Sequence, residues 1–371
     1  MQKYPSINGL RALSILSVII SHLDFKQGFF QDWKEDNHAL NLLKFFLQDA
    51  QFGVNVFFVL SGFLITSLLI EEERRTQTVS LKKFYIRRTL RIFPAYYFVL
   101  LVYFVLQIEN YLHLSDLSWI TALTFTKQFY RTEWFTAHFW SLSVEESFYL
   151  FWPLVFMGGD RFRKRAAVFL IILVPVIRTF LYFHPIAWID ELMLFTRIDA
   201  IAMGCFFAIY KDAIVAKLSP YWTAVFVVSA VAVVVLHDLP IHFAKIGLGF
   251  IFIPLGLTHG TIANVLIALI LMYSVFCQKG LWFRLLNTRV MDAIGLLSYS
   301  LYLWQQFFIS ERVDWINRFP QNVVLIFLTA IGSYYLIEKP FLRLKKKFSP
   351  EHAATKVEVV GLPARVGDPV A

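Results

Sequence analysis

The sequence predicts an all-α polytopic membrane protein, a bundle of about ten transmembrane helices with both termini in the cytoplasm. The 371 residues are 58% hydrophobic and 18% aromatic but only 16% charged, whereas soluble domains carry about 25% charged residues. Long apolar runs recur along the chain, and lipid is the solvent that accommodates them. Between these runs the Lys and Arg residues gather in short segments, which is how membrane proteins set their orientation.

The apolar runs define ten candidate spans, several of them shorter than the ~20 residues that a perpendicular helix needs. We expect such spans to continue into flanking polar residues inside the bundle. Residues 247–258 are apolar but too short to cross alone, and we interpret them as a re-entrant or interfacial segment. The candidate spans are residues 7–23, 52–70, 92–108, 140–157, 166–183, 197–210, 221–236, 261–277, 294–310 and 320–337.

Basic clusters predict which connections face the cytoplasm. Five clusters follow the even-numbered spans, at residues 74–91, 161–165, 211–217, 279–289 and 339–347. The intervening connections carry mixed or acidic charge, so the positive-inside rule places them outside. The first apolar run resembles a signal peptide, but no small-x-small cleavage site follows it, so we interpret it as a span. We expect one membrane domain over residues 1–347 and a disordered polar cytoplasmic tail over residues 348–371.

Composition also bears on partners and metals. The net charge of +9 could indicate nucleic acid, but the cations are dispersed among short connections rather than on one face, so we expect no nucleic-acid partner. Cys205 and Cys277 fall in apolar runs without metal-ligand spacing, which argues against a disulfide framework, a redox site or a metal centre.

Two ionisable residues share the first span, where such side chains are costly and usually functional. Arg11 and His22 are eleven residues apart, which returns a helix to within about 20° of the same face and separates them by ~16 Å along its axis. A cation near the cytoplasmic entrance and an imidazole deeper inside could connect an anionic donor to a reaction centre. A snorkelling Arg and an interfacial His would give the same spacing.

Arg88 and Arg91 adjoin the third span. Because residues three apart share a helix face, both guanidinium groups can bind one phosphate. The other cations between residues 74 and 83 are better explained by membrane orientation.

The fourth span begins with Trp140 and contains Glu145, which is four residues from both Ser141 and Tyr149. This spacing makes a polar stripe on an apolar helix, where a carboxylate could orient a histidine or act as a base. The alternative is an interfacial carboxylate stabilised by the helix dipole. Further polar residues that we interpret as supporting ones are Ser61, Arg197, Asp199, Ser298, Tyr299, Tyr302 and Glu338.

Taken in order, these segments resemble the integral membrane acyltransferase family known as acyltransferase 3, whose members O-acetylate surface polysaccharides, lipopolysaccharide, Nod factors and some macrolides. The seven matching strings cover residues 8 to 340, nearly the whole chain, and any one of them alone would be weak. They are residues 8–22 (NGLRA through His22), 53–65 (GVNVFFVLSGFLI), 88–97 (RTLRIFPAYY), 140–149 (WSLSVEESFY), 197–204 (RIDAIAMG), 298–304 (SYSLYLW) and 338–340 (EKP).

The resemblance implies ten helices in the cytoplasmic (inner) membrane and acetyl-CoA, or another acyl-CoA, as the donor substrate, with no permanently bound cofactor. By similarity, Arg11 and His22 match the family's Arg-x10-His motif, and Arg88 and Arg91 match its Arg-x-x-Arg motif. Glu145 matches the acidic residue after Trp-Ser-Leu.

Two departures from the family pattern bear on mechanism. Members often carry a histidine after Tyr-Leu-Trp in the ninth span, where this chain has Gln305 and Gln306. This difference leaves His22 as the strong candidate base. Some members also carry an extra span and a C-terminal hydrolase-like domain outside the membrane. Any step that needs such a domain would here require a separate periplasmic partner.

We therefore predict a membrane-embedded O-acyltransferase that moves an acetyl or other short acyl group from cytoplasmic acyl-CoA to a hydroxyl of a cell-surface or exported saccharide, which can be lipid-linked. In this hypothesis the basic residues at the entrance hold the acetyl-CoA phosphates. His22 is the general base, oriented by Glu145 or another carboxylate.

The main alternative is a transporter or flippase of lipid-linked glycans, which also needs buried charges but need not bind acetyl-CoA. A polytopic glycosyltransferase would normally show larger, acidic outward loops. A membrane scaffold would account for the hydrophobicity but not for the ordered polar motifs.

Overall fold

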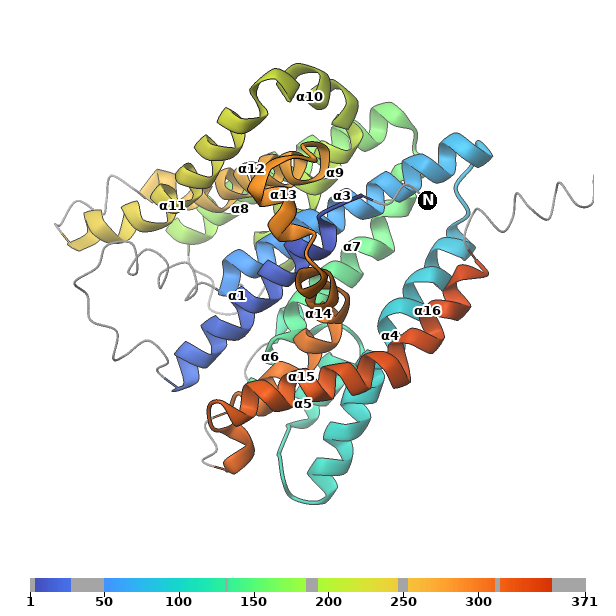
Figure 1. Ribbon diagram of the computed structural model, residues 1–371, viewed down its shortest axis with the longest axis vertical. Coiled ribbons are helices and arrows are strands. Elements are labelled where there is room, and N and C mark those ends of the chain that lie inside the picture. Colours follow the sequence, from blue (N-terminus) through green and yellow to red (C-terminus); the bar gives the residue numbers. More distant parts are fainter. Residues whose placement is uncertain are drawn as a thin grey trace, which may run out of the picture.

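The computed structural model describes residues 4–27, 50–130, 133–184, 193–245, 253–310 and 314–348. Within these ranges the regular elements are all helices (Figure 1), so the predicted all-α class is confirmed. The long helices are α1 (Ile7–Gln27), α3 (Ala50–Thr76), α4 (Leu81–Ile108), α7 (Phe139–Met157), α8 (Asp160–Phe183), α9 (Met193–Ile209), α11 (Trp222–Lys245), α12 (Ile253–Phe276), α14 (Arg289–Phe308) and α15 (Gln321–Ser333).

Shorter elements connect or extend these helices. A π-helical turn, η5 (Tyr334–Glu338), joins α15 to the C-terminal α16 (Lys339–Lys346). The others are α5 (Asp116–Leu123), η1 (Lys127–Phe129), α6 (Trp134–Ala137), α10 (Lys211–Leu218), η2 (Ser219–Tyr221), α13 (Gly280–Leu286) and η4 (Trp315–Asn317).

Six helical segments in the described ranges are long and apolar enough to cross a bilayer. They are Ile7–Lys26, Ala50–Thr76, Leu81–Ile108, Asp160–Phe183, Lys211–Leu236 and Gln321–Lys346. A seventh would be the pair Gly260–Phe276 and Gly280–Leu286, which is bent by 88°. The described part of the protein therefore has six or seven candidate membrane spans by length and composition.

The remaining predicted spans, residues 140–157, 197–210 and 294–310, are occupied by α7, α9 and α14. These helices are shorter or more polar, and α9 has only 17 residues. All three carry many buried residues and pack against other helices. Because protein rather than lipid covers much of their surface, they can carry polar side chains at low cost.

Two boundaries differ from the sequence-based expectation. Residues 253–258 form the start of α12, so they are not a separate re-entrant segment, and residues 247–252 lie outside the described ranges. Pro254 fits there because the first turn of a helix leaves its backbone N–H groups unbonded anyway. In addition, α4 begins at Leu81, capped by Ser80, so Arg88 and Arg91 project from the body of a helix rather than from its start.

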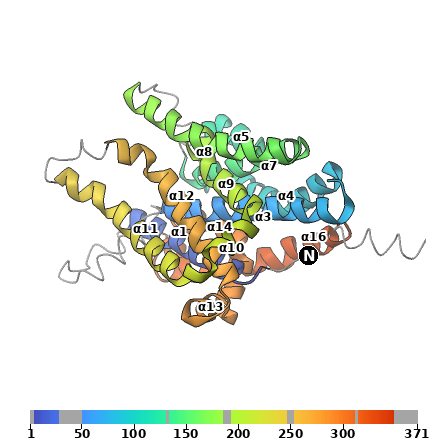
Figure 2. The same cartoon turned by 90° about the horizontal axis from the view of Figure 1, so that it is seen from above.

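The centre of the bundle is built from α1, α3, α9 and α14. Figures 1 and 2 place these helices between the α11–α12 pair on one side and the α4–α16 pair on the other. Where α3 crosses α9, Gly62 and Gly204 allow backbone contact, because a Cβ atom at either position would overlap the partner helix's main chain. Close approach of this kind is the usual reason for small residues between membrane helices.

α1 and α14 run parallel and in contact along their length. The Asn8 side chain donates to Asp292 at one end (2.7 Å), and His22 bonds Gln305 at the other (3.1 Å). The predicted single helix carrying both Arg11 and His22 is confirmed, since α1 is continuous over both.

Candidate active site

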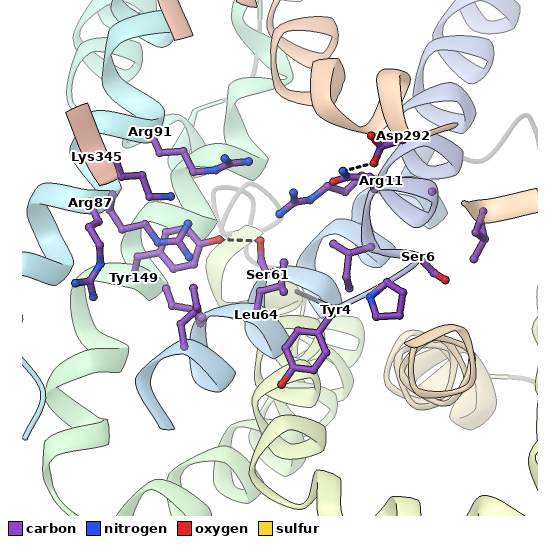
Figure 3. Close-up of a pocket in the computed structure, with 18 of the residues that line it drawn as sticks. Tyr4, Ser6, Arg11, Ser61, Leu64, Arg87, Arg91, Tyr149, Asp292 and Lys345 are labelled. Carbon is purple, nitrogen blue, oxygen red and sulfur yellow. Dashed lines mark hydrogen bonds between the residues drawn. The ribbon is translucent and has the colours of Figure 1, made fainter. Parts of the chain in front are cut away.

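A cavity of about 520 Å³, here called the outer cavity, lies among α1, α3, α4, α7 and α16 (Figure 3). Five cationic side chains line it, against two carboxylates, Glu72 and Asp292. In Figure 3, Arg87, Arg91 and Lys345 lie along one side and Arg11 lies across from them. The five cations are Arg11, Arg87, Arg88, Arg91 and Lys345.

Most of these cations lack an acidic partner. Arg87 forms an ion pair with Glu72 at 2.6 Å, and both side chains are nearly buried. In the described part of the chain, the other four cations of the outer cavity form no ion pair. Arg88 instead lies over the ring of Tyr149, 3.9 Å from its centroid. Five cations around a cavity lined by only two carboxylates repel one another, and this excess of positive charge favours an anionic ligand.

A second, narrower cavity of about 90 Å³, here called the inner cavity, adjoins the first. Arg11, Ser61, Arg88, Arg91 and Tyr149 line both cavities and so form the neck between them. Beyond the neck, the inner cavity is lined by polar groups of α7 and α14, namely Ser141, Glu145, Ser298, Tyr299 and Tyr302. The two cavities together lead from a basic opening to a set of hydroxyl groups and one carboxylate.

Glu145 lies at the end of a hydrogen-bonded chain of hydroxyl groups. Tyr149 donates to Ser61 at 2.7 Å, and Ser61 donates to one Glu145 oxygen at 2.8 Å. Nearby, Ser141 and Tyr302 share a 2.5 Å hydrogen bond. The polar stripe predicted on α7 is therefore real, and its residues face α3 and α14.

His22 lines neither cavity. It lies at the other end of α1, where its Nδ1 bonds the side-chain oxygen of Gln305 at 3.1 Å. Its ring also contacts Trp134 edge-to-face, with centroids 5.5 Å apart. The prediction that a carboxylate orients His22 is wrong. Glu145 bonds hydroxyl groups, and the partner of His22 is the side-chain amide of Gln305 on α14. An amide oxygen accepts from Nδ1–H and leaves Nε2 as the basic nitrogen.

A second histidine, this one buried, was missed by the sequence reasoning. His138 precedes α7, and its Nδ1 bonds the Gln306 oxygen at 2.6 Å. Its backbone carbonyl accepts from the hydroxyl of Tyr302 at 2.7 Å, which connects this end of the bundle to the inner cavity. The sequence could have indicated it, because His138 stands two residues before Trp140, where the motif of the fourth span begins. Gln305 therefore bonds the half-buried His22, and Gln306 bonds the buried His138.

Three predicted supporting residues lie outside both cavities. Asp199 is buried between α8, α9 and α12, where it accepts from Arg178, Thr261 and Asn264. Arg197 donates to Gln51 at 2.5 Å. Glu338 is buried against Ser300. These contacts hold helices together, whereas Ser61, Ser298, Tyr299 and Tyr302 line the inner cavity.

Within the described ranges, no group of three or more His, Cys, Asp and Glu side chains is placed to hold a metal ion. The expectation of a metal-free site stays a prediction.

The sequence is similar to a known protein family and to individual members with a described activity. A family model described as an acyltransferase domain matches residues 4–338. The peptidoglycan O-acetyltransferase OatA of Listeria monocytogenes is 34% identical over 177 residues, which cover 42% of this chain and 25% of that protein. The O-acetyltransferase OatA of Staphylococcus aureus is 27% identical, over 91% of this chain and 57% of that protein.

The chain thus spans between a quarter and about three fifths of the length of these curated relatives. No solved structure matches it. The family match covers every motif from Arg11 to Glu338 and gives no support to the transporter alternative. The chain therefore belongs to the acyltransferase 3 family of integral membrane proteins.

Proposed function

We propose that this protein is a membrane O-acetyltransferase that takes acetyl groups from acetyl-CoA and transfers them to saccharide hydroxyls. One observation carries the donor assignment: four cations without ion-pair partners among the described residues surround a cavity that narrows into a second, hydroxyl-lined one. Acetyl-CoA has the matching shape and charge, since its phosphates lie at one end of a thin pantetheine arm that ends in the thioester.

In this proposal the neck residues Arg11, Arg88 and Arg91 bind the diphosphate, and the arm runs through the inner cavity towards His22 at the other end of α1. Two arginines one helical turn apart can share one phosphate group through charge-assisted hydrogen bonds. Glu145 orders the hydroxyl groups of Ser61 and Tyr149 along the path of the arm.

The chemical step is general base catalysis by His22. Its Nε2 takes the proton of the acceptor hydroxyl while that oxygen attacks the thioester carbonyl carbon. The carbon–sulfur bond then breaks, and the departing thiolate takes the proton from the imidazolium. Gln305 supports this role, because its side-chain oxygen bonds the Nδ1 of His22. The side-chain nitrogen of Gln305 is buried and has no hydrogen-bond partner among the described residues. General base catalysis of this kind contributes about 10²- to 10⁴-fold.

We further propose ten spans, with α7, α9, α12 and α14 completing the set, and both termini in the cytoplasm. The basic lining of the outer cavity supports a cytoplasmic opening by the positive-inside rule. The membrane is then the cytoplasmic one, where acetyl-CoA is available. Residues 1–347 form the membrane domain in this proposal, and the expected cytoplasmic tail, residues 348–371, lies outside the described ranges beyond residue 348.

The named relatives support a cell-wall saccharide as acceptor, since one is a peptidoglycan O-acetyltransferase. The acceptor hydroxyl would approach from the His22 end of α1, ~16 Å along the helix axis from Arg11. Donor and acceptor would thus enter from opposite sides of the membrane.

The test uses purified protein in lipid nanodiscs, with radiolabelled acetyl-CoA and soluble peptidoglycan fragments. We expect His22→Ala to bind acetyl-CoA but to lose at least 100-fold in transfer, because only the base is removed. Arg88→Ala should lose donor binding. Lys83→Ala is the matched control, because Lys83 is an exposed cation of the same helix and lines neither cavity.

A folded His22→Ala protein with full transfer activity would refute the base assignment. Wild-type protein that neither binds nor consumes acetyl-CoA would refute the donor assignment.

A further inference from the structure

The outer cavity contains a cation that belongs to none of the motifs discussed above. Lys345 lies on α16, seven residues beyond the end of the matched family region. α16 packs along α4, which brings Lys345 to the same wall of the cavity as Arg87 and Arg91 (Figure 3). Its ordinary explanation would be a surface lysine that orients the membrane helix.

The surroundings of Lys345 argue against that explanation. The four other cations that line the outer cavity with Lys345, namely Arg11, Arg87, Arg88 and Arg91, are all of like charge. It forms no ion pair within the part of the chain that the structure describes. Lys346, the next residue, is exposed and lines neither the outer nor the inner cavity, as expected of an orienting lysine. Holding a fifth cation among arginines is unfavourable unless an anion binds there.

The position of Lys345 in the cavity specifies which part of an anionic donor it meets. Arg11, Arg88 and Arg91 line both cavities, whereas Lys345 and Arg87 line only the outer one. Glu72 already neutralises Arg87 at 2.6 Å. Lys345 is thus the uncompensated charge farther from the inner cavity.

Acyl-CoA carries phosphate at two places. The diphosphate adjoins the pantetheine arm, and a third phosphate sits on the ribose, farther from the thioester. If the pantetheine arm runs through the inner cavity, the diphosphate meets the arginines of the neck and the ribose phosphate stays in the outer cavity. We propose that Lys345 binds the ribose 3′-phosphate and makes the enzyme prefer acyl-CoA over 3′-dephospho-acyl-CoA. This assignment rests on the proposed function.

The test compares two donors with three proteins. Dissociation constants for acetyl-CoA and acetyl-3′-dephospho-CoA are measured in nanodiscs at fixed ionic strength for the wild type, Lys345→Gln and Lys346→Gln. We expect the wild type to bind acetyl-CoA about 10- to 100-fold more tightly, the value of one charge-assisted contact. Lys345→Gln should lose most of this preference while its affinity for the dephospho donor stays unchanged. Lys346→Gln should behave like the wild type.

The possible failures are distinguishable. If the wild type binds neither donor, the proposed function is wrong and the inference fails with it. If the wild type binds acetyl-CoA but Lys345→Gln keeps the full preference, or loses affinity for both donors equally, only the role of Lys345 is overturned. A loss equal to that of Lys346→Gln would mean a general effect of surface charge, which also refutes the inference.

Discussion

The clearest physical test of the donor site compares two arginines one helical turn apart on α4. Arg87 pairs with Glu72 at 2.6 Å, with side chains 10% and 5% exposed, and it also donates to the Phe348 carbonyl. Arg91 forms no ion pair among the described residues and lines both cavities. The same substitution, to methionine, should therefore change protein stability in opposite directions.

Arg87→Met leaves the Glu72 carboxylate buried without its partner, and breaking such a pair costs about 3–5 kcal/mol. Arg91→Met removes an uncompensated charge and should stabilise the ligand-free protein by roughly 1–3 kcal/mol. The apparent melting temperature of the purified protein should thus fall by several degrees for Arg87→Met and stay level or rise for Arg91→Met.

Adding acetyl-CoA separates stability from function. A ligand at 100 times its dissociation constant stabilises a protein by about 2.7 kcal/mol. Losing a phosphate contact worth about 2 kcal/mol weakens binding about 30-fold and reduces that stabilisation to about 0.9 kcal/mol. Arg91→Met should therefore melt at or above the wild-type temperature yet respond weakly to acetyl-CoA. If Arg91→Met melts well below the wild type and keeps the full ligand response, then Arg91 is a structural residue and the reasoning fails.

Three further predictions test other parts of the molecule. Gly62→Ala should destabilise the protein by about 1–3 kcal/mol, because the added Cβ would overlap α9. Gly332→Ala should not lower the melting temperature, because a Cβ there would meet no atom of another segment within 4 Å. Equal effects of the two substitutions would contradict the close helix crossing. Burial lowers the pKa of Lys127 from 10.5 to about 8, so the folded protein binds this proton less tightly than the unfolded chain does. Its melting temperature should rise from pH 8 to 10.5 relative to Lys127→Met, and parallel profiles would refute this. Gln305→Leu should lower kcat about 10- to 100-fold with little change in the KM for acetyl-CoA, and an unchanged kcat would remove Gln305 from the orientation of His22.

Several features of the site follow from sequence spacing alone. The helical period places Arg88 and Arg91 on one face of α4, and both line the same cavities. The same period puts Glu145 within reach of Tyr149, whose hydroxyl lies 3.4 Å from it. These relations are local, so they depend only on the residues forming a helix.

Other features depended on contacts between distant segments. Arg197 and Asp199 fall in a motif that looks functional, yet α9 directs them to Gln51 and to an ion-paired cluster with Arg178. In the sequence, Lys345 is one of several basic residues of the C-terminal segment. Its place in the outer cavity depends on the packing of α16 against α4. Which neighbour an ionisable side chain meets depends on helix packing, and a single sequence does not contain that information.

By itself, the sequence determined that this protein is an all-helical membrane protein with Arg11 and His22 on one helix, because hydropathy and helical period act within each segment. Only the tertiary structure decided that four cations with no ion pair in the described part of the chain share one cavity, and that Gln305, rather than Glu145, bonds His22. The physical reason is that charge repulsion, close helix crossings and hydrogen-bond partners arise only when helices far apart in the chain pack together.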